Sequence, residues 1–223
     1  MKRFQVEGVL FDLDGTLLDT IADLAEGANR MLAELGRPRR SQAEIHGFVG
    51  KGIPNLVERC LTEGSAATAA EIDRAISVFR RHYGAVNGSQ TRIYPGIEDS
   101  LAALRERGLR LGCVTNKAAA FTMPLLERVG LADWFQVVVS GDTLPVKKPD
   151  PAVLFHACRL LDIDPASALM VGDSANDALA ARAAGMPVVL VSYGYSEGQP
   201  VDTIECDGLL SDVRELLPRI LAP

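Results

Sequence analysis

The chain has 223 residues, of which 48% are hydrophobic and 23% charged, an ordinary composition for a globular protein with a full core. Its formal net charge of −6 disfavours a protein that binds nucleic acid or anionic membranes through a basic face. Its apolar runs are shorter than the ~18 residues of a membrane span, and its four cysteines lack the paired spacing of a zinc site. The apolar stretch after Lys2 and Arg3 is interrupted too soon for a signal peptide, so we expect a cytoplasmic protein.

The first predicted element is a short buried strand. An apolar run from Val6 to Phe11 stops at Asp12 and Asp14, just before the turn-forming Gly15. Residues two apart on a strand point the same way, so the two carboxylates would share one face if the extended geometry continues. Two like charges side by side are tolerable when a cation lies between them. A solvated Asp-rich turn explains the motif equally well, and the choice depends on the rest of the chain.

The next part of the chain is expected to be entirely helical. Apolar residues at a 3.6-residue period predict four helical segments, at residues 20–36, 41–49, 53–63 and 72–83. Thr20 is the expected cap of the first segment, and Ser41 begins a capping-box pattern in the second. Gly64 and Gly84 are expected to end the third and fourth. The polar residues 84–92 would then lead the chain back to the first strand.

Strands and helices alternate in the remainder of the chain. We predict strands at residues 109–115, 135–140, 168–172 and 188–192, and helices at residues 97–107, 118–129, 151–161, 175–184 and 213–221. Pro124 and Pro218 are expected to distort the helices that contain them. This alternation implies a parallel sheet covered on both faces. The sequence therefore predicts an α/β fold. A doubly wound, Rossmann-like core at residues 1–18 and 90–223 would carry an all-helical cap domain, residues 19–89, inserted after its first strand.

Three later strands end in polar clusters. Thr115 and Asn116 can bind phosphate oxygens or cap the next helix. Lys148 can act as a fixed positive charge or belong to a solvated basic turn. Asp173 and Asp177 can bind a cation, with Mg²⁺ the expected ion, or begin a helix with acidic residues. In an open parallel sheet the carboxyl ends of the strands meet at one edge, so all these residues are expected at one site.

The order and content of these clusters resemble the haloacid dehalogenase superfamily of phosphohydrolases over essentially the whole chain. The matching motifs are Phe11-Asp12-Leu13-Asp14-Gly15-Thr16-Leu17, Thr115-Asn116, Lys148-Pro149 and Gly172-Asp173 through Asp177. The resemblance implies Asp12 as nucleophile, Asp14 as acid/base, and Thr115 with Lys148 as catalytic residues on the phosphate. It also implies Mg²⁺ on Asp12, Asp173 and the Asp14 carbonyl, with Asp177 in support. The phosphate-binding residues that it implies are Gly15, Thr16, Thr115, Asn116 and Lys148.

Finer details resemble the bacterial phosphoglycolate phosphatases, which share much of this pattern with related sugar-phosphate phosphatases. They are the segments Leu17-Leu18-Asp19-Thr20, Val49-Gly50-Lys51-Gly52, Thr115-Asn116-Lys117 and Ser192-Tyr193-Gly194-Tyr195. The implied reaction is hydrolysis of 2-phosphoglycolate, a small phosphorylated metabolite, by a monomer or homodimer. Lys51, between two glycines, is the cap residue expected to pair with the substrate carboxylate, although a solvated lysine is the simpler interpretation.

Three alternatives remain. Another small sugar phosphate is a possible substrate, because the core is expected to contact only the phosphate. A phosphosugar mutase is disfavoured, because Leu24 stands where mutases resemble one another in having a cap histidine. A non-catalytic phosphate-binding sensor is the least favoured, because the acid, amide, lysine and metal set is complete.

Overall fold

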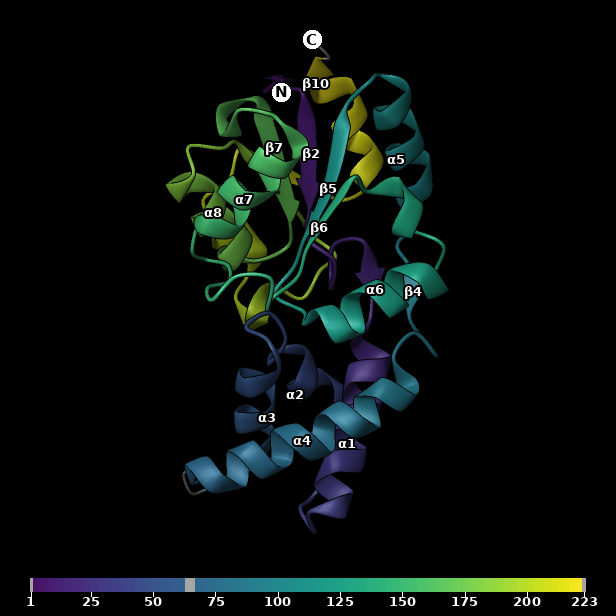
Figure 1. Cartoon of the computed structure of the whole chain (residues 1–223), viewed down its shortest axis with the longest axis vertical. Helices are drawn as coiled ribbons and strands as arrows, with labels where there is room; N and C mark the ends of the chain where they lie inside the picture. Colours follow the sequence, from purple (N-terminus) through teal and green to yellow (C-terminus); the bar gives the residue numbers. More distant parts are fainter. Residues whose placement is uncertain (1, 63–66, 222–223) are drawn as a thin grey trace.

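A computed structural model describes residues 2–62 and 67–221, which form an α/β core and a helical part on one side of it (Figure 1). Strand β1 (Phe4–Gln5) pairs in parallel with β10 (Ile220–Leu221), so the two ends of the described chain lie together. Both strands lie at the end of the core away from the helical part. Short 3₁₀ turns η1 to η4 connect the elements of the core, at Ala132–Trp134, Pro165–Ser167, Ser196–Gly198 and Val201–Thr203.

The core sheet has six parallel strands in the order β6-β5-β2-β7-β8-β9. Their bounds are β2 (Gly8–Phe11), β5 (Arg110–Val114), β6 (Val137–Val139), β7 (Ala168–Gly172), β8 (Val188–Val191) and β9 (Gly208–Leu210). The predicted strands are confirmed, whereas β9 was missed because its three residues are too few for a recognisable period. Phe11 is in register with Cys113 on β5 and with Val171 on β7. The carboxyl ends of these three strands therefore meet at the same edge.

Alternate residues of the sheet belong to two hydrophobic clusters, as the pleat of a strand requires. Val9 and Phe11 pack with residues of α5 (Ile97–Glu106), α6 (Ala119–Arg128) and the 3₁₀ helix η5 (Val213–Arg219). Leu10 packs with residues of α7 (Ala152–Leu161) and α8 (Ala175–Ala183). Figure 1 shows α5 on the opposite side of the sheet from α7 and α8. This arrangement confirms the doubly wound sheet.

The inserted part contains α1 (Ile21–Glu34), α2 (Gln42–His46), α3 (Ile53–Leu61) and α4 (Ala69–Val86), which together confirm a helical cap. The capping box at Ser41 is confirmed, and the predicted helix end at Gly64 lies outside the described residues. The predicted end at Gly84 is wrong, because α4 continues to Val86. Tyr83 and Val86 are buried in the cap's own hydrophobic cluster. Their packing outweighs the ~1 kcal/mol cost of a glycine inside a helix.

Two further expectations fail for physical reasons. Thr20 is the N-cap residue of α1, but its side chain makes no capping bond and its hydroxyl donates instead to Asp14 Oδ1, at 2.7 Å. The final helix is the 3₁₀ helix η5, followed by β10. Pro218 has no N–H to donate inside a helix. Ile220 and Leu221 are extended because they pair with β1.

The chain passes between core and cap through a short antiparallel ribbon of β3 (Leu18–Asp19) and β4 (Arg92–Ile93). The buried Asp23 carboxylate of α1 accepts hydrogen bonds from the N–H groups of Gly88, Gln90 and Thr91 and from the Thr91 hydroxyl. These bonds tie the returning segment to the first cap helix. We propose that the two domains join at this ribbon, in keeping with the predicted limits at residues 18 and 90.

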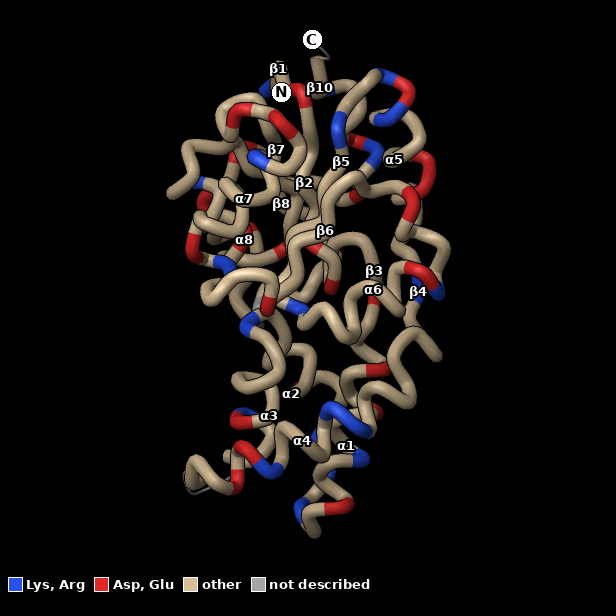
Figure 2. The backbone as a smooth tube through the Cα atoms, in the orientation of Figure 1, with Lys and Arg blue, Asp and Glu red and all other residues tan. Residues whose placement is uncertain are grey.

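Charged residues are distributed over both domains. Figure 2 shows Lys and Arg positions interspersed with Asp and Glu positions along the backbone. Opposite charges pair on the surface, as Arg81 does with Glu34 at 2.6 Å. Among the helices of the described segments, none has the length and apolar content needed to cross a membrane.

Candidate active site

The carboxyl edge of the sheet and the cap helices enclose a cavity. The core side of its lining is polar and contains Asp12, Asp14, Thr115, Asn116, Lys117, Lys148, Asp173, Ser174, Asn176, Asp177, Tyr195 and Ser196. The cap side is mostly apolar and contains Leu24, Val49, Gly50, Gly52, Ile53, Leu56, Phe79 and Tyr83. The polar clusters that follow separate strands in the sequence therefore converge on one site, and the cap covers it.

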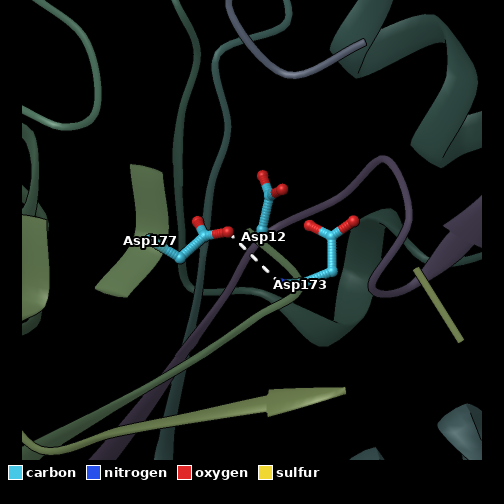
Figure 3. A group of neighbouring side chains, drawn as sticks. All are labelled: Asp12, Asp173 and Asp177. Carbon is cyan, nitrogen blue, oxygen red and sulfur yellow. Dashed lines mark hydrogen bonds between the residues drawn. The ribbon is translucent and has the colours of Figure 1, made fainter. Parts of the chain in front are cut away.

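Three carboxylates of the core converge at this edge (Figure 3). One oxygen from each of Asp12, Asp173 and Asp177 lies within 4.8 Å of the others. Burial raises the pKa of Asp12 to about 7. The nearby Asp177 charge adds to this rise, and the Lys148 ammonium opposes it. Burial, together with the charges of Asp177 and Asp12, raises the pKa of Asp173 well above its ordinary value. Such a set of buried oxygens is stabilised by a hard divalent cation and fits Mg²⁺.

Asp177 differs from the other two because protein donors already occupy both of its oxygens. Oδ1 accepts a hydrogen bond from Lys148 Nζ at 2.7 Å. Oδ2 accepts from the N–H groups of Asp173 and Ser174, at 3.2 and 3.1 Å, and from the Ser174 hydroxyl at 2.8 Å. Asp177 therefore anchors the start of α8 and the catalytic lysine candidate. This supports Asp12 and Asp173 as the side chains that would hold a metal, with Asp177 behind them.

Lys148 lies between the carboxylates rather than in a solvated turn. Its side chain is buried, and its ammonium contacts Asp12 Oδ1 at 2.8 Å and donates to the Val114 carbonyl at 2.6 Å. Burial alone would lower the pKa of Lys148, but the Asp12 and Asp177 charges outweigh it and raise the pKa. The lysine is therefore a fixed positive charge beside the candidate nucleophile.

Asp14 faces a different partner, Lys117, which the sequence interpretation did not assign to the site. Lys117 Nζ lies 3.0 and 3.2 Å from the two carboxylate oxygens of Asp14 and donates to the Tyr83 hydroxyl at 2.6 Å. The Lys117 side chain is buried although it carries a charge. Its position in the Thr115-Asn116-Lys117 segment was the available signal. Nothing in that segment indicates a contact with a tyrosine 34 residues away in the cap.

The motif residues Gly15 and Thr16 do not line the cavity. Gly15 has φ +86°, and a Cβ atom there would lie 2.2 Å from Asp173 Oδ2. The glycine is therefore required to bring the first loop against the Asp173 carboxylate. Thr16 is buried, and its hydroxyl has no hydrogen-bond partner within the described part of the chain. Phosphate binding by these two residues stays a prediction.

Thr115 and Asn116 do line the cavity. Neither caps α6, whose N-cap residue is Ala118. The Thr115 hydroxyl accepts the N–H of Lys117 at 3.2 Å, which keeps its own proton available for a ligand oxygen. Asn116 Nδ2 donates to the carbonyls of Gly50 and Lys148, both at 2.9 Å. The Asn116 side chain therefore connects the cap to the core.

Lys51 has an exposed side chain and is not part of the cavity lining, whereas both of its flanking glycines, Gly50 and Gly52, are. Its pairing with a substrate carboxylate stays a prediction. Tyr195, which the sequence left unassigned, lines the cavity instead. Its N–H donates to Asp173 Oδ2 at 2.6 Å, and its hydroxyl accepts the N–H of Thr20, also at 2.6 Å. Tyr195 therefore joins the carboxylate cluster to the start of the cap.

Comparison with known proteins agrees with this geometry. The family model described as "Haloacid dehalogenase-like hydrolase" matches residues 9–191. The chain is 48% identical to "Phosphoglycolate phosphatase, plasmid" of Cupriavidus necator, over 96% of this chain and 93% of that protein. It is 50% identical to the phosphoglycolate phosphatase of Nitrosospira multiformis, over 94% of this chain and 93% of that protein.

Solved structures show the same fold. A predicted phosphoglycolate phosphatase from Haemophilus somnus superposes with a TM-score of 0.91 and 32% identity, over 96% of this chain and 97% of that one. CbbY from Rhodobacter sphaeroides, solved in complex with phosphate, gives a TM-score of 0.79 and 25% identity, over 95% of this chain and 96% of that one. The chain therefore belongs to the haloacid dehalogenase-like hydrolases and is a phosphoric monoester hydrolase.

Proposed function

We propose that this protein hydrolyses 2-phosphoglycolate to glycolate and phosphate, with Mg²⁺, through an aspartyl-phosphate on Asp12. The observation that carries the proposal is the pairing of two carboxylates with two buried lysines in one cavity. Asp12 contacts Lys148, and Asp14 contacts Lys117. Relatives named phosphoglycolate phosphatase, at 40–50% identity over most of the chain, support the choice of substrate.

The residues of the core account for the first half of the reaction. An oxygen of Asp12 attacks phosphorus, the bond between phosphorus and the ester oxygen breaks, and Asp14 donates a proton to the departing glycolate. Lys148 and the Thr115 hydroxyl bind the phosphoryl oxygens and offset the repulsion between phosphate and nucleophile. A bound Mg²⁺, held by Asp12 and Asp173, would supply positive charge for the same purpose.

The second half uses the same groups in the opposite sense. A water molecule attacks the phosphorus of the aspartyl-phosphate, Asp14 accepts its proton, and the bond between phosphorus and the Asp12 oxygen breaks. The products are inorganic phosphate and the original Asp12 carboxylate. Asp14 lies two residues from the nucleophile and outside the acidic cluster, which places it for both steps. The Lys117 ammonium and the Thr20 hydroxyl stabilise its carboxylate, the form that accepts the proton of water. That proton leaves Asp14 in the protonated form in which it enters the first step of the next turnover.

The cap side of the cavity favours a small leaving group over a sugar. Leu24, Ile53 and Phe79 offer no hydrogen-bonding side-chain atoms to the hydroxyl groups of a sugar. Buried hydroxyl groups without partners reduce binding strongly. Leu24 also lacks the proton-transferring group that a mutase needs at this position. Both observations favour a phosphatase for a short substrate with few hydroxyl groups.

Phosphate release from a panel of substrates tests the proposal. We expect the highest kcat/KM for 2-phosphoglycolate, lower values for glucose 6-phosphate and p-nitrophenyl phosphate, and loss of activity with excess chelator. The Asp12→Asn variant should be inactive but folded, as judged by circular dichroism. An active Asp12→Asn variant contradicts the nucleophile, and a sugar phosphate with the higher kcat/KM contradicts the substrate. Conversion of a sugar 1-phosphate to the 6-phosphate, without phosphate release, would instead favour a mutase.

A further inference from the structure

We propose that Lys117 is the cation that recognises the carboxylate of the substrate's leaving group, and that Tyr83 of the cap positions it for this role. The inference rests on the proposed function, because it names the residue that would make 2-phosphoglycolate the preferred phosphomonoester. It transfers to Lys117 the role that the sequence suggested for Lys51.

The position of Lys117 along the reaction path is the first argument. Asp14, as the proton donor, must reach the ester oxygen, and Lys117 Nζ lies directly against the Asp14 carboxylate, 3.0 Å from Oδ1. In 2-phosphoglycolate the carboxylate carbon is two bonds beyond the ester oxygen. A substrate with its phosphoryl group at Asp12 and its ester oxygen at Asp14 therefore brings its carboxylate to the neighbourhood of Lys117.

The distribution of charge in the cavity is the second argument. Of the described residues that line it, the only lysines or arginines are Lys117 and Lys148. Lys148 is surrounded by Asp12, Asp177 and the Val114 carbonyl, on the phosphoryl side. A second anionic group that enters a cavity with an apolar cap wall needs a positive partner to offset its desolvation. Lys117 is the one placed to provide it.

The donors of Lys117 are the third argument. An ammonium has three N–H groups, and two side chains contact this one, Asp14 and Tyr83. When Asp14 accepts through a single oxygen, one N–H remains for a ligand. The Tyr83 hydroxyl, 2.6 Å from Nζ, fixes the direction of the lysine from the cap side. The Tyr83 ring is buried between Phe79 and Phe121, so its hydroxyl has a defined place.

A charge-selectivity measurement tests this assignment. The quantity is the ratio of kcat/KM for 2-phosphoglycolate to kcat/KM for its neutral amide, at saturating Mg²⁺. Lys117→Met removes the charge but keeps an apolar chain of similar length, and we expect the ratio to fall about 10- to 100-fold. Tyr83→Phe removes only the hydroxyl, and we expect a fall of roughly 2- to 10-fold. Any general loss from a displaced Asp14 affects both substrates and cancels in the ratio.

Two further variants serve as comparisons. Lys2→Met is the matched control, because Lys2 also pairs with a carboxylate, Asp207 at 2.5 Å, but on the surface of the core. It should leave the ratio unchanged. Lys51→Met tests the rival assignment. Circular dichroism establishes that each variant is folded, and Tyr83→Phe provides the test if Lys117→Met is not.

The outcomes separate this inference from the proposed function. A wild-type enzyme that prefers the carboxylate, together with folded variants that lose the preference at Lys117 and Tyr83, supports both. A wild-type preference that survives in Lys117→Met, or in Tyr83→Phe where Lys117→Met is unfolded, overturns the inference and leaves the proposed function intact. A preference lost in Lys51→Met alone does the same. A wild-type enzyme that does not distinguish the two substrates overturns the substrate assignment, and the inference with it.

Discussion

Asp12→Asn is expected to stabilise the metal-free protein at pH 8, although it removes the proposed nucleophile. Asp12 is only 9% exposed and lies within a cluster of three carboxylates. Burial and the neighbouring Asp177 charge raise its pKa from 3.8 to about 7. Asparagine has nearly the shape of a protonated aspartate but cannot ionise. The variant therefore keeps position 12 in its uncharged, low-pH state at every pH.

The sign and size of the effect follow from proton linkage. The native state binds the Asp12 proton more tightly than the unfolded chain, so the stability that this proton contributes is fully present below pH 4. It is lost as the pH rises through about 7. A tenfold difference in proton affinity is worth about 1.4 kcal/mol, so the rise of the pKa from 3.8 to about 7 corresponds to about 4 kcal/mol. This is a large share of the ~5–15 kcal/mol that stabilises a typical domain.

Thermal and urea denaturation at pH 5, 6, 7 and 8, in the presence of a chelator, measures this difference. The variant and the wild type should have similar stability only at or below about pH 4. Above it they diverge, by about 1.5 kcal/mol at pH 5 and about 4 kcal/mol at pH 7 to 8, with the variant the more stable. The exposed Asp73→Asn is the matched control, because it removes a carboxylate outside the buried cluster. Added Mg²⁺ should stabilise the wild type more at pH 8 than at pH 5, since the cation binds the ionised carboxylates. A wild type that gains stability relative to Asp12→Asn as the pH rises, without metal, would refute the argument.

Two other substitutions test the structure around the site. Gly15→Ala should lower the unfolding free energy by about 1–2 kcal/mol, because φ at this residue is +86°. It should also weaken Mg²⁺ affinity about 10- to 100-fold, because the added Cβ would displace Asp173. Gly36→Ala is the control for the backbone cost alone, because Gly36 has φ +66° and open space around its Cβ. Equal Mg²⁺ affinity in the two variants would contradict the contact between the residue 15 Cβ and Asp173. Asp23→Ala should destabilise the protein by about 3 kcal/mol in urea denaturation, because three part-buried N–H groups of the returning segment lose their buried, charged acceptor. A cost no larger than that of the exposed Asp73→Ala would show that Asp23 does not hold the ribbon.

The core half of the site could be predicted from the sequence because strand geometry dictates it. Asp12, Thr115 and Asp173 each follow a buried strand directly, and parallel strands in register bring such positions to one edge. The pairing of Phe11 with Cys113 and Val171 fixes this alignment. A local rule also located the second cap helix, since Ser41 forms the predicted capping box with Glu44. Thr68 forms a second box with Glu71, and α4 therefore begins three residues before the predicted residue 72.

The cap half could not be predicted in the same way, because its contacts depend on how two domains dock. The hydrogen bond between Lys117 and Tyr83 joins residues on separate elements with no local signal. Thr20 shows the same limit on a smaller scale, since a nearby carboxylate takes the hydroxyl that helix rules assign to capping. Lys51 was predicted to bind substrate because it lies between two glycines. The contact with the core is made instead by the Gly50 carbonyl, which accepts a hydrogen bond from Asn116.

The two carboxylates of the first motif are two residues apart, yet they belong to different electrostatic environments. Asp12 lies with Asp173 and Lys148, where the proposed reaction would bring the phosphoryl group beside a positive charge. Asp14 lies with Lys117 and Thr20, on the side where the leaving group would depart in the proposed reaction. Because Lys117 is also held by the cap, the leaving-group half is complete only when core and cap are together. Under the proposed function, phosphate chemistry would belong to the core and substrate discrimination to the contact between core and cap.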